Sequence, residues 1–237
     1  MGRIEQARVE LGSPNVVWYR GHIQGDWSLV PSLLRRRVDQ AKEGLLFHKF
    51  KQRAMELASP QKSAWETLFD MQHYGVPTRL LDWTEVLGVA LYFSSVDVSA
   101  MKMGGLSISA NPCVWVLNPG RLNESARGSR DLVRCGDSNF SYEVDYWSDV
   151  ECRVGEVFAI DPPFRNARIN AQRGMFTVHG DPRCLSEVYP EAVRKVHAVC
   201  DGTEMERFFE YAGLNPHALF PDLEGLATFL RATCGVR

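Results

Sequence analysis

Apolar residues change their spacing about a third of the way along this 237-residue chain, and this change constrains the fold more than any other feature. Over 41–58 the apolar positions recur at intervals of four, four and three residues: Leu46, Phe50, Ala54 and Leu57. That spacing predicts an amphipathic helix. A second helical stretch over 65–72 is followed by Gly75 and Pro77, which are typical of a helix end.

Short β-branched and apolar runs dominate the rest of the chain. We predict strands over 16–20, 113–117, 154–160, 175–178 and 193–199. We predict further helices over 203–212 and 223–232, and one carrying 86–93 with Thr84 as its N-cap. The segment 121–149 is polar and irregular. The prediction is therefore an α+β fold in one domain over 1–237, its helical first third packed on a mixed, mainly antiparallel sheet.

Composition excludes several classes of protein. Hydrophobic residues make up 45% and charged residues 24%, so the chain is not disordered. The net charge of −2 argues against sequence-independent binding to nucleic acid or membrane, although it leaves room for a local basic patch. The longest apolar run, 86–93, is too short to span a bilayer, and the first six residues do not resemble a signal peptide. We expect a cytoplasmic protein that does not bind membranes.

The six cysteines lie apart and form no C-x-x-C pair. Their spacing favours reduced thiols over a disulfide framework or a zinc site. His179 and Cys184 also lack partners at metal-ligand spacing, so we expect no metal. The chain has no G-x-S-x-G, Walker A or G-x-G-x-x-G motif, which weakens hydrolase, NTPase and Rossmann hypotheses.

Four clusters carry the candidate chemistry. The first is 18–22, where Arg20 stands at a strand end beside Gly21. A guanidinium there is suited to hold a phosphate or a carboxylate, and Gly21 allows another group to approach closely. A surface arginine at a turn is the alternative interpretation.

The second cluster, 73–84, is the densest. His73 is a candidate general base or hydrogen-bond donor, and Arg79 is a candidate anion ligand. Tyr74 and Trp83 offer flat faces for stacking, and Asp82 offers a carboxylate for a sugar hydroxyl or for Arg79. The structural alternative is a buried Arg79–Asp82 pair that braces a turn between two helices.

Two later clusters and one basic run complete the set. Gln172, before a glycine and a strand, is a candidate ligand for an amide or hydroxyl, or an edge residue at a turn. Glu224 follows Pro221 at a helix start, where capping alone explains an acid. The run 35–37 holds three arginines, which indicates a solvated patch or a contact with nucleic acid.

At the four clusters the sequence resembles the FRG domain family, named for a Phe/Tyr-Arg-Gly motif that stands here at 19–21. The second family motif resembles 73–84 followed by 90–93, the third resembles 172–176, and the last resembles 219–225. The motifs span residues 15–233. The resemblance implies a bacterial or phage protein, with a role as a toxin or in anti-phage defence.

The order of these motifs is also similar to a distant ADP-ribosyltransferase, which implies a split sheet and NAD⁺ as substrate. The resemblance then implies that Arg20 grips phosphate or ribose, that Trp83 or Tyr92 stacks on the ring, and that Arg79 and His73 hold a second group. The implied catalytic set is Arg20, His73, Arg79, Gln172 and Glu224. The implied nucleotide contacts are Tyr19, Gly21, Tyr74, Thr78, Asp82, Trp83, Thr84 and Tyr92.

The chain departs from the transferase pattern at the late acidic position. Most such enzymes use a glutamate there, whereas this chain has Gln172, with Glu224 and Glu151 as fallback carboxylates. Three hypotheses follow: an ADP-ribosyltransferase or NAD⁺ hydrolase with a protein, nucleic-acid or water acceptor; a non-catalytic sensor that binds a nucleotide or a protein; and an RNA-directed toxin. The first requires Arg20, Arg79 and Asp82 to lie in one concave site.

Overall fold

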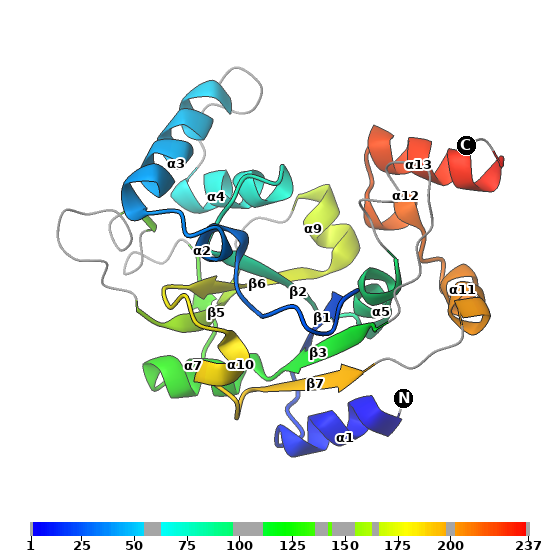
Figure 1. Cartoon of the computed structure of the whole chain (residues 1–237), viewed down its shortest axis with the longest axis horizontal. Coiled ribbons are helices and arrows are strands. Elements are labelled where there is room, and N and C mark those ends of the chain that lie inside the picture. Colours follow the sequence, from blue (N-terminus) through cyan, green and yellow to red (C-terminus); the bar gives the residue numbers. More distant parts are fainter. Residues whose placement is uncertain are drawn as a thin grey trace.

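The computed structural model describes residues 2–54, 63–96, 111–135, 142–143, 155–162, 166–197 and 202–235 (Figure 1). The helices are α1 (Gly2–Glu10), α2 (Ser32–Arg35), α3 (Gln40–Ala54), α4 (Ala64–His73), α5 (Leu87–Ser95), α7 (Pro119–Arg127), α9 (Ala167–Gln172), α10 (Leu185–Val188), α11 (Gly202–Tyr211), α12 (Pro216–Leu219) and α13 (Leu223–Thr233). The strands are β1 (Trp18–His22), β2 (Leu80–Thr84), β3 (Cys113–Leu117), β4 (Val133–Arg134), β5 (Val157–Asp161), β6 (Gly174–His179) and β7 (Val193–His197).

The strands form one seven-stranded sheet in the order β4-β5-β6-β2-β1-β3-β7. Every neighbouring pair is antiparallel except β4 and β5, which run parallel. The prediction of an α+β fold with a mixed, mainly antiparallel sheet is therefore confirmed. No helix among the described residues is long and apolar enough to cross a membrane.

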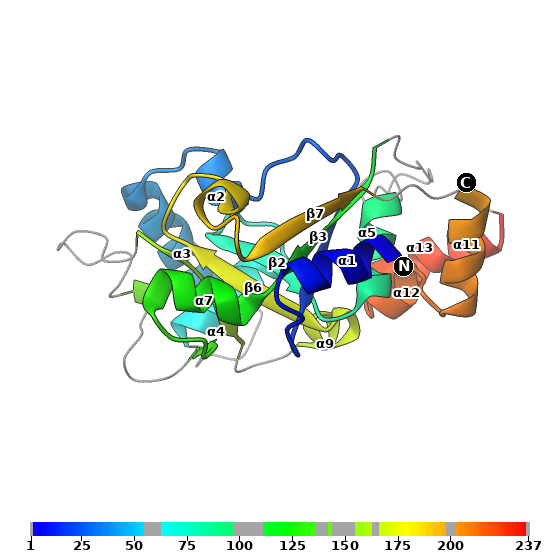
Figure 2. The ribbon, with the colours of Figure 1, turned by 90° about the horizontal axis from the view of Figure 1, so that it is seen from below.

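The sheet is buried on both faces because alternate residues of each strand enter different clusters. In β2, Leu81 and Trp83 join a core with the chain around Leu29 and with α10. Leu80 faces the opposite way and packs against α4 and α9. Figure 2 shows this division, with α2 and α10 on one side of the sheet and α4 and α9 on the other. We call these the α2 face and the α4 face.

Local sequence signals explain how the helices of the α4 face begin. Ser63 caps α4 through a capping box, in which its hydroxyl accepts from the N–H of Glu66 and the Glu66 carboxylate accepts from the N–H of Ser63. Asn166 caps α9 by accepting from the N–H of Ile169. These caps place the end of α4 and the whole of α9 beside β2 and β6.

Two parts of the predicted secondary structure were wrong. Residues 80–84 form β2 and not a turn, and α5 begins after Val86, so Thr84 is not its N-cap. The Thr84 hydroxyl still accepts from the N–H of Val86, which bends the chain from strand to helix. The helices α1, α7 and α9 were not predicted, because most of their residues are polar.

The sheet opens between β1 and β2. These strands pair at one position, Tyr19 with Thr84, whereas β1 pairs with β3 at five positions from Trp18 to His22. The backbone carbonyl of Arg79 accepts from the N–H of His179, and the N–H of Glu85 donates to the carbonyl of Arg173. Because the backbone groups of successive residues point to alternate sides of a strand, the carbonyl of Asp82 points toward β1. This carbonyl accepts a hydrogen bond from the Arg20 side chain and not from the backbone of β1. The opening between the two strands forms the floor of a pocket.

Candidate functional site: a pocket over the opening between β1 and β2

A pocket of about 260 Å³ lies on the α4 face at the opening in the sheet. Helices α4, α5 and α9 supply its walls, and β1, β2 and β6 supply its floor. Its lining is mixed, with polar side chains from β1, β2, α4 and α9 and several aromatic rings. The lining residues are Tyr19, Arg20, Gly21, Phe69, Gln72, His73, Asp82, Trp83, Thr84, Val89, Ala90, Phe93, Arg168, Ile169, Gln172, Gly174 and Phe176.

Arg20 spans the opening between the two strands. Its Nη1 donates to the carbonyl oxygen of Asp82 at 2.6 Å, and its Nε donates to Nε2 of His22 at 2.9 Å. Burial, with the nearby Arg20 charge, lowers the pKa of His22 to about 3, so this imidazole is neutral and able to accept. The guanidinium is thereby held at two points, while Nη2 has no hydrogen-bond partner among the described residues.

Arg168 brings a second guanidinium into the pocket from α9. It stacks on Phe220, with 4.8 Å between the guanidinium carbon and the ring centroid, and its Nη1 donates to the carbonyl oxygen of His73 at 3.3 Å. Burial lowers the pKa of Arg168, and nearby Asp82 opposes that shift. Sequence reasoning missed this residue, although it lies four positions before Gln172 and so on the same side of the helix.

Asp82 provides the carboxylate of the pocket. Its Oδ2 accepts from Nε2 of Gln72 at 2.8 Å and lies 3.7 Å from Nη1 of Arg20. Gln72 is itself oriented by Thr78, whose hydroxyl donates to the amide oxygen at 2.5 Å. The Asp82 side chain is 54% exposed, and its Oδ1 has no hydrogen-bond partner among the described residues. One carboxylate oxygen is therefore available to a ligand hydroxyl.

His73 and Gln172 flank the second arginine. Burial, together with the charge of Arg168, lowers the pKa of His73, so its imidazole is neutral near pH 7. Gln172 stands at the end of α9 and not on a strand, and its Nε2 donates to the carbonyl oxygen of Leu219 at 3.0 Å. Its amide oxygen has no hydrogen-bond partner among the described residues.

Arg79 does not lie in this pocket, so the prediction that it shares one site with Arg20 was wrong. Its Nε and Nη2 donate to both carboxylate oxygens of Glu43 at 2.7–2.9 Å, and its Nη1 donates to the carbonyl of His179. Tyr142 donates to the same carboxylate at 2.7 Å. The predicted Arg79–Asp82 ion pair was also wrong, because the buried carboxylate of Glu43 balances the charge of Arg79.

Four other predicted site residues lie outside the pocket lining. Tyr74 is 73% exposed beside the end of α4, and Thr78 acts only through Gln72. Tyr92 faces away from the pocket into a cluster with Phe209, where burial raises its pKa to about 12. Glu224 is exposed in the first turn of α13, and its charge acts on Arg168. Glu151 lies outside the described residues.

The remaining predicted residues do line the pocket: Arg20, His73, Gln172, Tyr19, Gly21, Asp82, Trp83 and Thr84. Trp83 is almost fully buried and donates from Nε1 to the hydroxyl of Thr177. The aromatic ring that stands partly open in the wall is Phe93 of α5, which contacts Phe220 edge to face.

The glycines of two motifs have a packing role. A Cβ on Gly21 would lie 1.9 Å from the carbonyl oxygen of Ala90, because β1 and α5 touch through their backbones. A Cβ on Gly225 would lie 1.9 Å from the carbonyl oxygen of Phe220, where α12 and α13 meet. Asp222 caps α13 by accepting from the N–H of Gly225. The late motif therefore holds Phe220 against Arg168 and supplies no group to the pocket.

The described residues contain no group of three or more His, Cys, Asp or Glu side chains suited to a metal ion. The described cysteines, Cys113, Cys135, Cys184 and Cys234, are free thiols. The donors that converge on the pocket are guanidinium, imidazole and amide groups, which suit an anionic organic ligand better than a cation.

Comparison with known families agrees with the motif at β1. The FRG domain model matches residues 15–102, which cover β1, α2 to α5 and β2. Residues 15–102 therefore carry an FRG domain. The matched segment supplies Arg20, His73 and Asp82, whereas Arg168 and Gln172 come from the chain beyond it. Comparison with curated proteins and with solved structures gave no match.

Proposed function

We propose that the pocket binds NAD⁺ and breaks its ribosyl–nicotinamide bond, so that the protein is an NAD⁺ hydrolase or an ADP-ribosyltransferase. The observation that carries this proposal is the meeting of two partly free guanidinium groups and one half-free carboxylate over the opening of the sheet. Arginines pair with phosphates through two parallel donors, and a carboxylate accepts from vicinal hydroxyls. These are the two polar parts of the nicotinamide half of NAD⁺.

Each group has a defined part in the proposed reaction. Arg20 and Arg168 hold the pyrophosphate, and Phe93 packs against the nicotinamide ring. As the bond between ribose C1′ and the ring nitrogen breaks, its electron pair passes to the nitrogen and neutral nicotinamide leaves. The carboxylate of Asp82 stabilises the positive charge that develops on the ribose. Neutral His73 takes the proton from the water or acceptor that attacks C1′.

Asp82 thereby takes the part that the sequence had offered to Gln172, Glu224 or Glu151. A pocket of 260 Å³ is slightly smaller than most small-molecule sites, which suits the nicotinamide–ribose–phosphate half better than the whole dinucleotide. The adenosine half then extends toward solvent. In a bacterial cell, depletion of NAD⁺ by this reaction gives the toxin or anti-phage role that the family resemblance implies.

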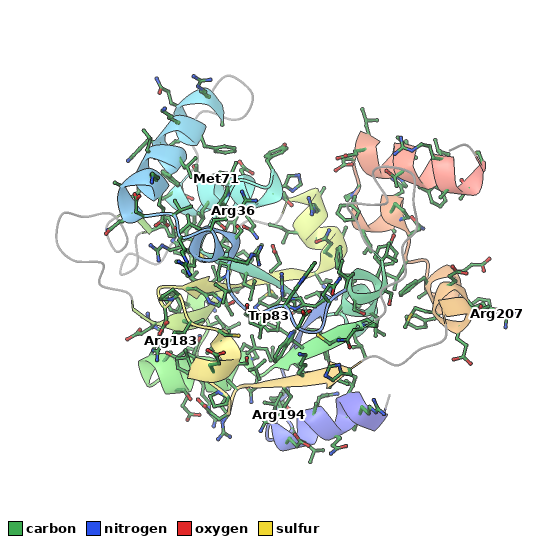
Figure 3. The ribbon with its side chains drawn as sticks, viewed as in Figure 1. Arg36, Met71, Trp83, Arg183, Arg194 and Arg207 are labelled. Carbon is green, nitrogen blue, oxygen red and sulfur yellow. The ribbon has the colours of Figure 1, made fainter. Side chains whose placement is uncertain are left out.

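The test is release of nicotinamide from NAD⁺, alone and with candidate acceptors, by the purified chain. We expect Asp82→Asn to lower turnover while it retains binding, because the amide still accepts from a hydroxyl but carries no charge. Arg168→Ala is expected to weaken binding. Arg207→Ala is a matched control, since this exposed arginine lies on α11, away from the pocket (Figure 3).

Binding without turnover is the second candidate function. The observation in its favour is that Asp82 is the one carboxylate among the described residues of the pocket lining, and Gln72 and Arg20 already engage one of its oxygens. Saturable binding of NAD⁺ or ADP-ribose by calorimetry, with no nicotinamide released, would establish a sensor and exclude the enzyme. Absence of both binding and release would exclude the pocket as a nucleotide site.

A further inference from the structure

A row of cationic and aromatic side chains crosses the other face of the sheet. In the strand register, Arg20 of β1 lies opposite Trp115 of β3, and Trp115 lies opposite Lys195 of β7. Directly opposed residues share one face of a sheet. The Nζ of Lys195 lies 5.3 Å from the centroid of the Trp115 ring, and Lys195 is exposed near the sheet edge. The row therefore runs from the pocket opening to the surface.

An exposed indole stands beside this row. Trp27 is 50% exposed, and its ring contacts that of His22 edge to face with 6.1 Å between centroids. His22 in turn contacts Trp115, with 6.5 Å between centroids. Because His22 is nearly fully buried, it fixes the exposed ring against the sheet. A half-exposed tryptophan held by its neighbours offers a flat surface at low entropic cost.

The charged groups that act on His22 are all positive. Besides burial, the groups that lower the pKa of His22 are Arg20, Lys195 and Arg35, all of them cations. Arg35 is the first of three consecutive exposed arginines at the end of α2. Neither this run nor Lys195 forms an ion pair within the part of the chain that the structure describes. Asp26, the acid next to Trp27, is likewise not paired with them.

We propose that this surface, defined by Trp27, Arg35–Arg37 and Lys195, binds single-stranded nucleic acid. Unpaired cations supply contacts to successive phosphates, and the exposed indole supplies a stacking face for a base; together these are the two elements of sequence-tolerant binding to single strands. The net charge of −2 does not oppose this assignment, because acids elsewhere on the chain balance a local basic surface. In this proposal, Arg35–Arg37 bind phosphates.

A single strand fits this surface better than a duplex. A base must leave its stack before it can pack on Trp27, and single strands offer such bases without the cost of unpairing. Arg20 links this surface to the pocket, because its Nε donates to His22 and its Nη1 donates to the carbonyl oxygen of Asp82. Binding to it requires no NAD⁺ and is independent of the reaction proposed above.

Fluorescence anisotropy with labelled twelve-nucleotide single strands of RNA and DNA tests the proposal at several salt concentrations. Unlabelled UMP and a duplex of the same sequence serve as competitors. The variants are Trp27→Ala and Lys195→Ala, with Tyr211→Ala and Arg207→Ala as matched controls on α11, where both residues are exposed. Figure 3 shows Arg36, which follows α2, well separated from Arg207 on α11.

We expect salt-dependent binding of the single strands, with a Kd that rises roughly tenfold in Trp27→Ala because base stacking is lost. Lys195→Ala should reduce the slope of log K against log salt by about 0.7, as expected for one lost phosphate contact. The control variants should bind like the unmodified chain. Absence of binding at low salt, equal losses in the controls, or displacement by UMP or duplex as effective as by the single strand would each overturn the proposal.

Different results would contradict the proposed nucleic-acid surface and the proposed NAD⁺ pocket. Loss of oligonucleotide binding in Trp27→Ala with unchanged nicotinamide release would support the surface as a distinct site. An active enzyme that binds no oligonucleotide would overturn the surface and leave the pocket proposal intact.

Discussion

Arg20 lies in β1 and Arg79 lies immediately before the neighbouring strand β2, yet their surroundings differ completely. Arg79 has all of its guanidinium nitrogens engaged, by the carboxylate of Glu43 and by a backbone carbonyl, and both charged side chains are buried. Arg20 lines a pocket and makes two hydrogen bonds and a 3.7 Å contact with the Asp82 carboxylate, while its Nη2 has no hydrogen-bond partner among the described residues. An arginine whose donors are all satisfied holds the fold together, whereas one with spare donors at a cavity can bind a ligand.

The largest expected effect breaks the buried pair. Glu43→Ala leaves the guanidinium of Arg79 buried without a counter-charge and deprives Tyr142 of its acceptor, so we expect a loss of about 3–5 kcal/mol in the free energy of unfolding. Urea denaturation measures it. Glu124→Ala is the control, because its pair with Arg130 is exposed and its loss should be far smaller. Equal losses would show that Arg79 is not structurally special.

The next effect concerns the arginine with spare donors. Arg20→Met should raise the Kd for NAD⁺ about 10–100-fold, since a charge-assisted hydrogen bond to phosphate contributes roughly 1.5–3 kcal/mol. It should lower the unfolding free energy less than Glu43→Ala does. Arg20→Lys should not restore binding, because an ammonium cannot contact His22, Asp82 and a phosphate in one plane. Calorimetry and urea denaturation on the same samples separate the two roles.

Buried histidines give the third effect, a dependence of stability on pH. Burial lowers the pKa of His22 and of His179 to about 3, below the usual 6.5. Between these values the unfolded chain binds more protons than the folded chain, so stability falls as the pH drops below about 6.5. Each histidine contributes up to about 1.4 kcal/mol per pH unit.

Urea denaturation between pH 7.5 and pH 5 measures this slope. His179→Asn should reduce it, because the variant lacks one of the histidines that take up a proton on unfolding. A slope unchanged by that substitution would mean that His179 titrates normally in the folded protein.

The smallest expected effect concerns a motif residue outside the pocket. Tyr74 belongs to the densest motif but is largely exposed and does not line the cavity. Tyr74→Ala should change the affinity for NAD⁺ by no more than about 0.5 kcal/mol, which is about twofold in Kd. A loss as large as that of Arg20→Met, measured by the same calorimetry, would show that the ligand extends beyond the pocket lining.

Sequence patterns predicted the elements whose apolar periodicity is strong. The strands at 113–117 and 193–197, and the helices α3, α4 and α13, follow directly from spacing. The helix α9 was not predicted because its six residues are too few to show an apolar periodicity, and Arg168 was missed for the same reason. Sequence adjacency also suggested pairing Arg79 with Asp82, but along a strand residues three apart point to opposite faces. A buried partner on a distant helix, such as Glu43, leaves no local signal.

The backbone carbonyl of Asp82 accepts its hydrogen bond from the Arg20 side chain. In a regular strand pair, a backbone N–H of the neighbouring strand would be the donor. A phosphate that attracts the Arg20 guanidinium competes with that peptide group for the same donor. Occupancy of the cavity is therefore coupled to the vibration of one backbone bond. An isotope label on the carbonyl carbon of residue 82 would turn the amide I band of that peptide into an infrared reporter of what the cavity holds.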